Sequence, residues 1–147
     1  MARVAAAHRT TGAGSATLPI SSAYSLGTGG LWLVEVGVTN TTTTAFEVSL
    51  KRVSSTGTQG TAQTVVYEEN DANLTAKVDV RDTHTVAPTL VAGEIRRASI
   101  GASIGSGIIW TFGGRGLFLP SGTGNGFVLM PITGTGQIAD VYWSLDQ

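Results

Sequence analysis

Apolar and polar residues alternate with a period of two along much of this chain, which is the pattern of half-buried β-strands. In residues 31–38, "LWLVEVGV", one predicted face carries Trp32, Val34, Val36 and Val38. The same alternation predicts strands over 45–53 and 76–80. Shorter apolar runs predict further strands over 17–24, 63–67, 94–100, 107–112, 116–119, 126–132 and 138–144.

Clusters of Gly, Thr, Ser and Asn separate these strands, and no segment carries a helical stripe with caps. About ten short strands within 147 residues predict a single all-β domain. We expect a jelly-roll-like antiparallel β-sandwich over residues 17–147, with its last four strands joined as a meander. Pro131 has no backbone N–H, so we expect it at a strand end or on a sheet edge.

The first sixteen residues lack this alternation, and they carry Arg3, His8 and Arg9 but no acidic residue. The run "TTGAGSA", residues 10–16, has the composition of a flexible linker. We therefore expect residues 1–16 to form an extended N-terminal arm that leaves the sandwich and is held by a neighbouring molecule.

Charged residues make up 13% of the chain and hydrophobic residues 41%, whereas about 25% is charged in an ordinary soluble domain. So little charge predicts that much of the surface is buried against other subunits. The net charge of −1 favours neither nucleic acid nor a membrane as a partner. The chain has no Cys, which leaves neither disulfides nor thiolate metal ligands. No secretion signal or membrane span is recognisable near the start.

Residues 101–105, "GASIG", match the spelling of the nucleophile elbow of serine hydrolases at Ser103. An elbow needs a following helix, but a β-type run follows here, and both His8 and His84 precede the serine. We interpret the match as a turn between strands. Residues 134–139 imitate a dinucleotide-binding fingerprint in the same way, and we interpret them as a hairpin turn.

Two acidic stretches contain candidate metal ligands, and we interpret both as solvated loops. One holds Glu68, Glu69 and Asp71, and the other holds Asp79, Asp82 and His84. Neither has the ligand spacing of a known calcium loop or a histidine cluster. We therefore predict no catalytic residue, no metal and no cofactor, and expect that the chain is not an enzyme.

Arginines outnumber lysines by seven to two, and arginine is the cation that interfaces favour. Arg96 and Arg97 adjoin in a predicted strand, and Arg115 lies in the turn "GGRG". Together with residues of the expected arm, they give the predicted partner-binding set: Arg3, Val4, His8, Arg9, Arg96, Arg97 and Arg115.

The run "AFEVSLKRVSSTGTQGTAQTVVYEENDANLTAKVDV", the segment Leu117-Phe-Leu119-Pro120 and the closing Val141-Tyr142-Trp143 carry a resemblance in layout. Over residues 31–147 the chain resembles small proteins encoded among the virion genes of tailed bacteriophages. Members of this kind are similar to jelly-roll capsid decoration (cement) proteins, which assemble as trimers on the outside of the head.

The resemblance implies a structural virion protein that is made in the host cytoplasm, binds the major capsid protein and itself, and stabilises the capsid by bridging its subunits. Two alternatives remain open at this point. One is a carbohydrate-binding jelly roll of a tail or fibre, with Trp110, Tyr142 and Trp143 stacking on sugar. The other is a small enzyme on a cupin-like barrel, which the missing histidine cluster disfavours.

Overall fold

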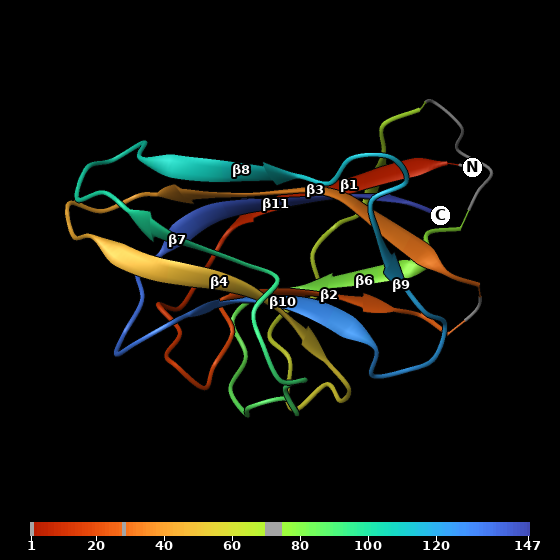
Figure 1. Ribbon diagram of the computed structural model, residues 1–147, viewed down its shortest axis with the longest axis horizontal. Coiled ribbons are helices and arrows are strands. Elements are labelled where there is room, and N and C mark those ends of the chain that lie inside the picture. Colours follow the sequence, from red (N-terminus) through yellow and green to blue (C-terminus); the bar gives the residue numbers. More distant parts are fainter. Residues whose placement is uncertain (1, 28, 70–74) are drawn as a thin grey trace.

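The computed structural model describes residues 2–27, 29–69 and 75–147, and within these ranges it contains strands and no helix. The strands, labelled in Figure 1, are β1 (Arg3–Arg9), β2 (Ser21–Ser25), β3 (Leu31–Asn40), β4 (Phe46–Val53), β5 (Val66–Tyr67), β6 (Val78–Arg81), β7 (Arg96–Ile100), β8 (Gly107–Thr111), β9 (Leu117–Leu119), β10 (Gly126–Pro131) and β11 (Ala139–Asp146). Each strand predicted from the alternation has a counterpart here. The all-β prediction is therefore confirmed.

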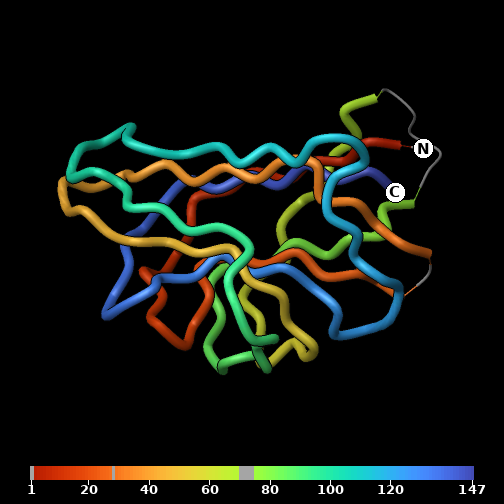
Figure 2. The backbone as a smooth tube through the Cα atoms, in the orientation of Figure 1, coloured from red at the N-terminus to blue at the C-terminus, as the bar shows by residue number. Residues whose placement is uncertain are grey.

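The strands form two antiparallel sheets that face each other as a sandwich (Figures 1 and 2). The β1 sheet has the order β5-β1-β11-β3-β8, with β9 also pairing with β3, and the β2 sheet has the order β6-β2-β10-β4-β7. Four antiparallel pairs, β1–β11, β2–β10, β3–β8 and β4–β7, alternate between the two sheets. This winding is a jelly roll, so the predicted fold is confirmed.

The core lies between the sheets and is made of the inward-facing residues of every long strand. Trp143 of β11 is fully buried, and its indole Nε1 donates a 2.9 Å hydrogen bond to Ser21 Oγ in the opposite sheet. Phe127 and Leu129 of β10 and Leu50 of β4 are also fully buried. The sandwich is therefore held by apolar contact between layers, and the Trp143–Ser21 hydrogen bond adds a polar link across it.

The prediction of an N-terminal arm is wrong for the described residues, because β1 is an interior strand of its sheet. All seven residues of Arg3–Arg9 pair with β11, and Val4 and Ala5 also pair with β5. Val4 is 0% and Ala6 2% exposed. The alternation of Val4, Ala6 and His8 with outward residues is present but weak, since alanine carries little apolar surface. The chain before residue 17 therefore belongs to the sandwich.

Two details of the predicted strand arrangement are also corrected. The last four strands are not a meander, because β10 lies in the β2 sheet and β11 in the β1 sheet. Residues 134–139 accordingly cross between sheets instead of forming a hairpin. Pro131 ends β10, as expected from its missing N–H.

A bulge in β3 reverses part of the face predicted from the alternation. The β3–β11 register slips between Ser144 and Leu145, leaving Val34 as an extra residue. Leu31 and Leu33 therefore point into the core, while Val36 remains inside beyond the bulge. Trp32, predicted to face inward, is half-buried on the outer face instead.

Candidate functional site

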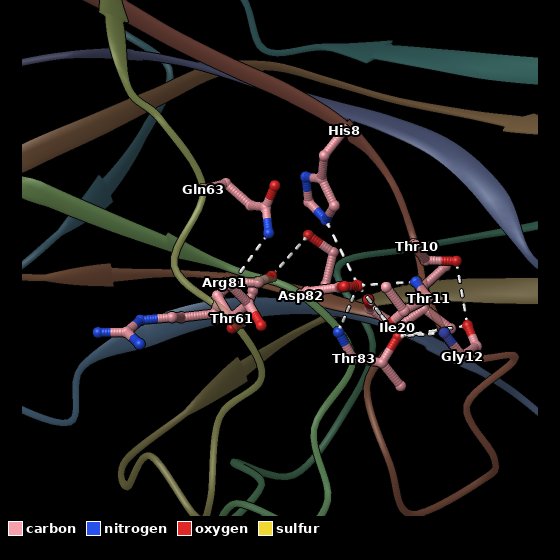
Figure 3. A network of polar contacts seen from close by, with 12 residues as sticks. His8, Thr10, Thr11, Gly12, Ile20, Thr61, Gln63, Arg81, Asp82 and Thr83 are labelled. Carbon is pink, nitrogen blue, oxygen red and sulfur yellow. Dashed lines mark hydrogen bonds and ion pairs between the residues drawn. The ribbon is translucent and has the colours of Figure 1, made fainter.

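A buried carboxylate, Asp82, organises the polar cluster shown in Figure 3. Its Oδ1 accepts hydrogen bonds from Thr83 N at 2.7 Å, Thr11 N at 3.1 Å and Thr83 Oγ1 at 3.2 Å. His8 Nε2 lies 3.9 Å from the same oxygen. Asp82 is 2% exposed. We call His8, Thr11, Asp82 and Thr83 the Asp82 cluster.

The local sequence places these groups together because β1 and β6 end near one another in opposite sheets. His8 is the last inward residue of β1, Thr10 and Thr11 follow the strand, and Asp82 directly follows β6. Figure 3 shows the His8 ring pointing at the Asp82 carboxylate. Thr83 Oγ1 also lies within hydrogen-bond distance of the Gly12 and Ile20 carbonyls. The cluster therefore ties the chain after β1 to the end of β6.

Burial shifts the pKa values of Asp82 and His8, the two ionisable groups of the Asp82 cluster, in opposite directions. Burial alone would raise the pKa of Asp82, but the hydrogen bonds from Thr83 and Thr11 outweigh it and lower this pKa, and His8 adds to the lowering when its ring is protonated. The pKa of His8 is lowered by burial, against the attraction of Asp82. Neither ring nitrogen of His8 has a hydrogen-bond partner among the described residues. The arrangement thus favours a charged carboxylate beside a neutral imidazole.

A second buried histidine, His84, lies under the loops that cover the outer face of the β2 sheet. Its Nε2 is 2.8 Å from Ser22 Oγ, and its ring centroid is 6.1 Å from that of Tyr24. Burial lowers its pKa to about 4, although backbone groups of Val86 and Thr56 act in the other direction. Ser22 and His84 are 0% and 2% exposed. This Ser–His pair is closed to solvent in the structure.

The prediction of a solvated loop with Asp79, Asp82 and His84 is wrong, because Asp82 and His84 are buried and all three have different partners. Asp79 pairs with Arg81 at 2.8 Å, whereas Asp82 and His84 sit in the two buried sites just described. In the described part of the chain, no three metal-ligating side chains gather. Of the other acidic stretch, Glu68 accepts from Ser144 Oγ at 2.7 Å, and Asp71 lies outside the described residues.

The four predicted partner-binding residues of β1 are engaged within the chain itself. Arg3 Nε pairs with Asp146 Oδ1 and Arg9 Nε with Asp140 Oδ1, each at 2.8 Å. Val4 is fully buried, and the His8 side chain is 5% exposed. The prediction that Val4 and His8 contact a partner is therefore wrong, because the inward side chains of an interior strand do not reach the surface.

The remaining three predicted residues are exposed and lie on the segment that contains β7 and β8. Arg96 stacks over the Phe112 ring at 5.2 Å, and Arg97 pairs with Glu94 at 3.6 Å. Arg115 lies 5.9 Å from the ring centroid of Trp32, and Trp32 packs against Phe118 at 4.8 Å. Phe118 is 44% exposed. The structure therefore brings arginines and aromatic rings together beside β8.

The sugar-stacking residues considered from the sequence do not form an exposed platform. Trp110 is 8% and Trp143 0% exposed. Tyr142 is half-buried and donates a hydrogen bond to Glu35. The surface contact of Trp32 with Phe118 was missed, since Trp32 faces outward only because of the bulge in β3. No signal in the residue pattern predicted that bulge.

No protein-family model and no curated protein matches the chain. Among solved structures, the chain is similar to hydroquinone 1,2-dioxygenase from Sphingomonas sp. TTNP3 with 4-hydroxybenzoate bound, with a TM-score of 0.32, 9% identity and coverage of 99% of this chain and 60% of that one. It is also similar to a "KBV activated particle at acidic pH", with a TM-score of 0.30, 10% identity and coverage of 87% of this chain and 49% of that one. For a "nora virus structure" the TM-score is 0.24 and the identity 7%, and the match covers 96% of this chain and 52% of that one.

The chain thus spans between 49% and 60% of the length of these three chains, two of which belong to virus particles. The prediction that the chain is not an enzyme is withdrawn, since one of the structures that the chain is similar to is a dioxygenase. With TM-scores below 0.5, none of these likenesses is an argument for a particular reaction or partner. No helix in the described residues is long and apolar enough to cross a membrane.

Proposed function

We propose that this chain is a structural protein of a virus particle, and that it is a decoration protein on the outside of a phage head. It would bind the major capsid protein there and stabilise the head by bridging capsid subunits. The jelly roll supplies a rigid body for such a role, and the resemblance in layout over residues 31–147 implies it. Fold alone does not assign a function, so the proposal needs a feature of the surface.

The observation that carries the proposal is an apolar surface with little charge to cover it. Charged residues are 13% of the chain. Among the described residues, nine large hydrophobic side chains are nevertheless exposed by 37–72%: Leu26, Val66, Val86, Leu90, Val91, Ile104, Ile109, Phe118 and Ile138. In the proposed role, the capsid and neighbouring copies cover part of this exposed apolar area.

Arg96, Arg97 and Arg115 are the proposed charged contacts on this surface. Their guanidinium groups are exposed, and the one carboxylate paired with any of them is Glu94 among the described residues. Stacking on Phe112 and Trp32 holds two of these cations against the chain, which lowers the conformational freedom lost on binding. Arg3 and Arg9, already paired, contribute less. Self-association belongs to the same proposal.

The proposal is tested by locating the protein in particles. Phage or prophage particles from the encoding strain are purified, identified by mass spectrometry and examined by cryo-electron microscopy with a tagged copy of the chain. We expect density on the outer head surface, in fixed stoichiometry to the major capsid protein. Absence from the particles, or density confined to the tail, would contradict it.

The capsid contact is tested with particles stripped of the chain. Rebinding of the intact protein is compared with that of an Arg96→Ala, Arg97→Ala and Arg115→Ala variant, and the Arg9→Ala variant is the matched control. We expect weaker rebinding for the triple variant alone. Equal rebinding by all three proteins would remove these arginines from the interface.

A further inference from the structure

Edge strands expose backbone groups that can pair with another chain, and soluble proteins usually block them. Three of the edges in this sandwich are blocked. The β5 edge is two residues long, and the β7 edge carries the exposed Arg96 and Arg97. Residues 61–63 cover the β6 edge, where Gln63 N donates to Val80 O at 2.8 Å. A blocked edge resists pairing with a second sheet.

The β8 edge has none of these protections. Residues 98–114 contain no charged residue and no proline, and β8 itself spans five residues, Gly107–Thr111. Ile109 in its centre is 60% exposed, and Ile104 in the preceding turn is 72% exposed. Within the described ranges no strand pairs with β8 on the side away from β3, and Figure 1 shows it as the outermost long strand of its sheet.

The hydrogen bonds to β3 show which backbone groups of β8 face outward. Asn40 N donates to Ser106 O at 2.7 Å, and Phe112 N donates to Val34 O at 2.9 Å. In an antiparallel ladder, alternate residues direct both their N–H and C=O to the same neighbour. The even-numbered residues of β8 therefore face β3, and Gly107, Ile109 and Thr111 offer their N–H and C=O groups to a partner.

The side chain of Ile109 lies on the outer face of the sheet, in one row with Gly37 and Tyr142. Gly37 pairs with Ile109 on one side and with Tyr142 on the other, and the Tyr142 ring lies over the space that a Cβ at Gly37 would fill. None of the three residues of this row is charged. A neighbouring strand would meet apolar contact as well as backbone pairing.

We propose that the β8 edge pairs with the β8 edge of a second copy of this chain, antiparallel and centred on Ile109. Ile109 then lies opposite Ile109 of the other copy, and Gly107 opposite Thr111. All three outward-facing residues find hydrogen-bond partners, and no charged side chain of β8 enters the interface. The same surface serves both copies, so the result is a two-fold dimer with one continuous sheet.

This proposal rests on the edge geometry and not on the proposed virion role. A trimer would need a second, different surface on each copy, because an isologous pairing closes with two subunits. The partner is a second copy because the residues of this edge are uncharged, and because the outward N–H and C=O groups of one copy match those of the other. A partner with a charged strand would bury that charge against Ile109.

The first test is the mass of the protein in solution. Sedimentation or light scattering from about 1 µM to about 1 mM should show a concentration-dependent dimer. Ile109→Lys should be monomeric throughout this range, whereas Val86→Lys, at a residue 54% exposed away from the edge, should dimerise as the unaltered chain does. Circular dichroism melting checks that both variants fold.

The second test reads the register, and the chain has no cysteine to interfere. Ile109→Cys should form a disulfide between copies on mild oxidation, because paired Cα atoms lie about 5.5 Å apart. Thr111→Cys is the matched control, since its two copies would lie about 14 Å apart, four residues along the strand. An unaltered chain that stays monomeric, an oligomer that Ile109→Lys leaves intact, or equal cross-linking at both positions would overturn the proposal.

Discussion

At the scale of single residues, the polar groups inside this sandwich are held in particular charge states. Asp82 is stabilised as a carboxylate by donors from Thr11 and Thr83, while His8 and His84 are buried as neutral rings. A neutral histidine in the core is stable only while the solvent does not favour its protonation. These residues therefore link the stability of the fold to pH.

Stability should fall when the solution is acidified from pH 7.5 to 4.5. The unfolded chain binds a proton at each histidine with a pKa near 6.5, whereas in the folded chain His84 binds it at about 4. His84 stabilises the fold fully above about pH 6.5, and this contribution is lost as the pH falls towards 4. We expect a loss of about 1–3 kcal/mol in urea unfolding.

The control for this pH dependence is His84→Gln, which keeps a polar group near Ser22 and removes the titration. The variant should lose less stability than the unaltered chain over the same interval. The depressed pKa of Asp82 acts in a separate window, because its contribution is lost only as the pH falls below about 4. An unchanged slope in the variant would exclude His84 as the source.

Gly37 is needed because the ring of Tyr142 lies where its side chain would be. A Cβ at position 37 would overlap the Tyr142 ring, which is held by its hydrogen bond to Glu35. Gly37→Ala should reduce the free energy of unfolding by about 1–3 kcal/mol. In a Tyr142→Ala background most of this loss should disappear, and a double-mutant cycle measures the coupling. Additive losses would show that the two residues do not compete for space.

At the scale of elements, the most consequential strand is the one predicted to be an arm. Removal of residues 1–9 should prevent cooperative folding, because β11 and β5 would both lose β1 and the inward Val4 and Ala6 would be missing from the core. Thermal melting followed by circular dichroism measures this. A truncated chain that melts cooperatively within a few degrees of the intact one would show that β1 is dispensable.

The sequence predicted the elements well where side chains carry the signal. Alternation in residues such as Val48 and Leu50 located β4, and Pro131 marked the end of β10. It missed β1 because Ala5, Ala6 and Ala7 give almost no contrast between faces. It missed the burial of Asp82 and His84 because their partners, Thr11 and Ser22, are more than sixty residues away. Long-range pairing of polar groups leaves no local pattern.

At the scale of the whole molecule, the jelly roll brings the two ends of the described chain side by side, as Figure 2 shows. Ala2 N donates to Gln147 O at 3.1 Å, and Gln147 N donates to Ala2 O at 2.9 Å. The β1–β11 pair therefore joins the most distant segments of the sequence. Pairing of such distant strands is slow, because the entropy of closing a long loop opposes it before any contact is gained.

Joining residue 147 to residue 1 by a short Gly–Ser linker should therefore speed folding without changing the fold. The permuted chain would open between Gly113 and Gly114, where a Cβ would touch nothing and both residues are exposed. In it, β11 and β1 become a local hairpin. We expect faster refolding in stopped-flow fluorescence of the buried Trp143, with little change in the unfolding rate if this pair is already formed in the transition state.

The control is a second permutant that is opened at the same place but has a linker too short to keep the Ala2–Gln147 pairing. It should fold slowly or not at all. An equal refolding rate in the first permutant and the original chain would mean that another pairing, such as β3 with β8, limits folding.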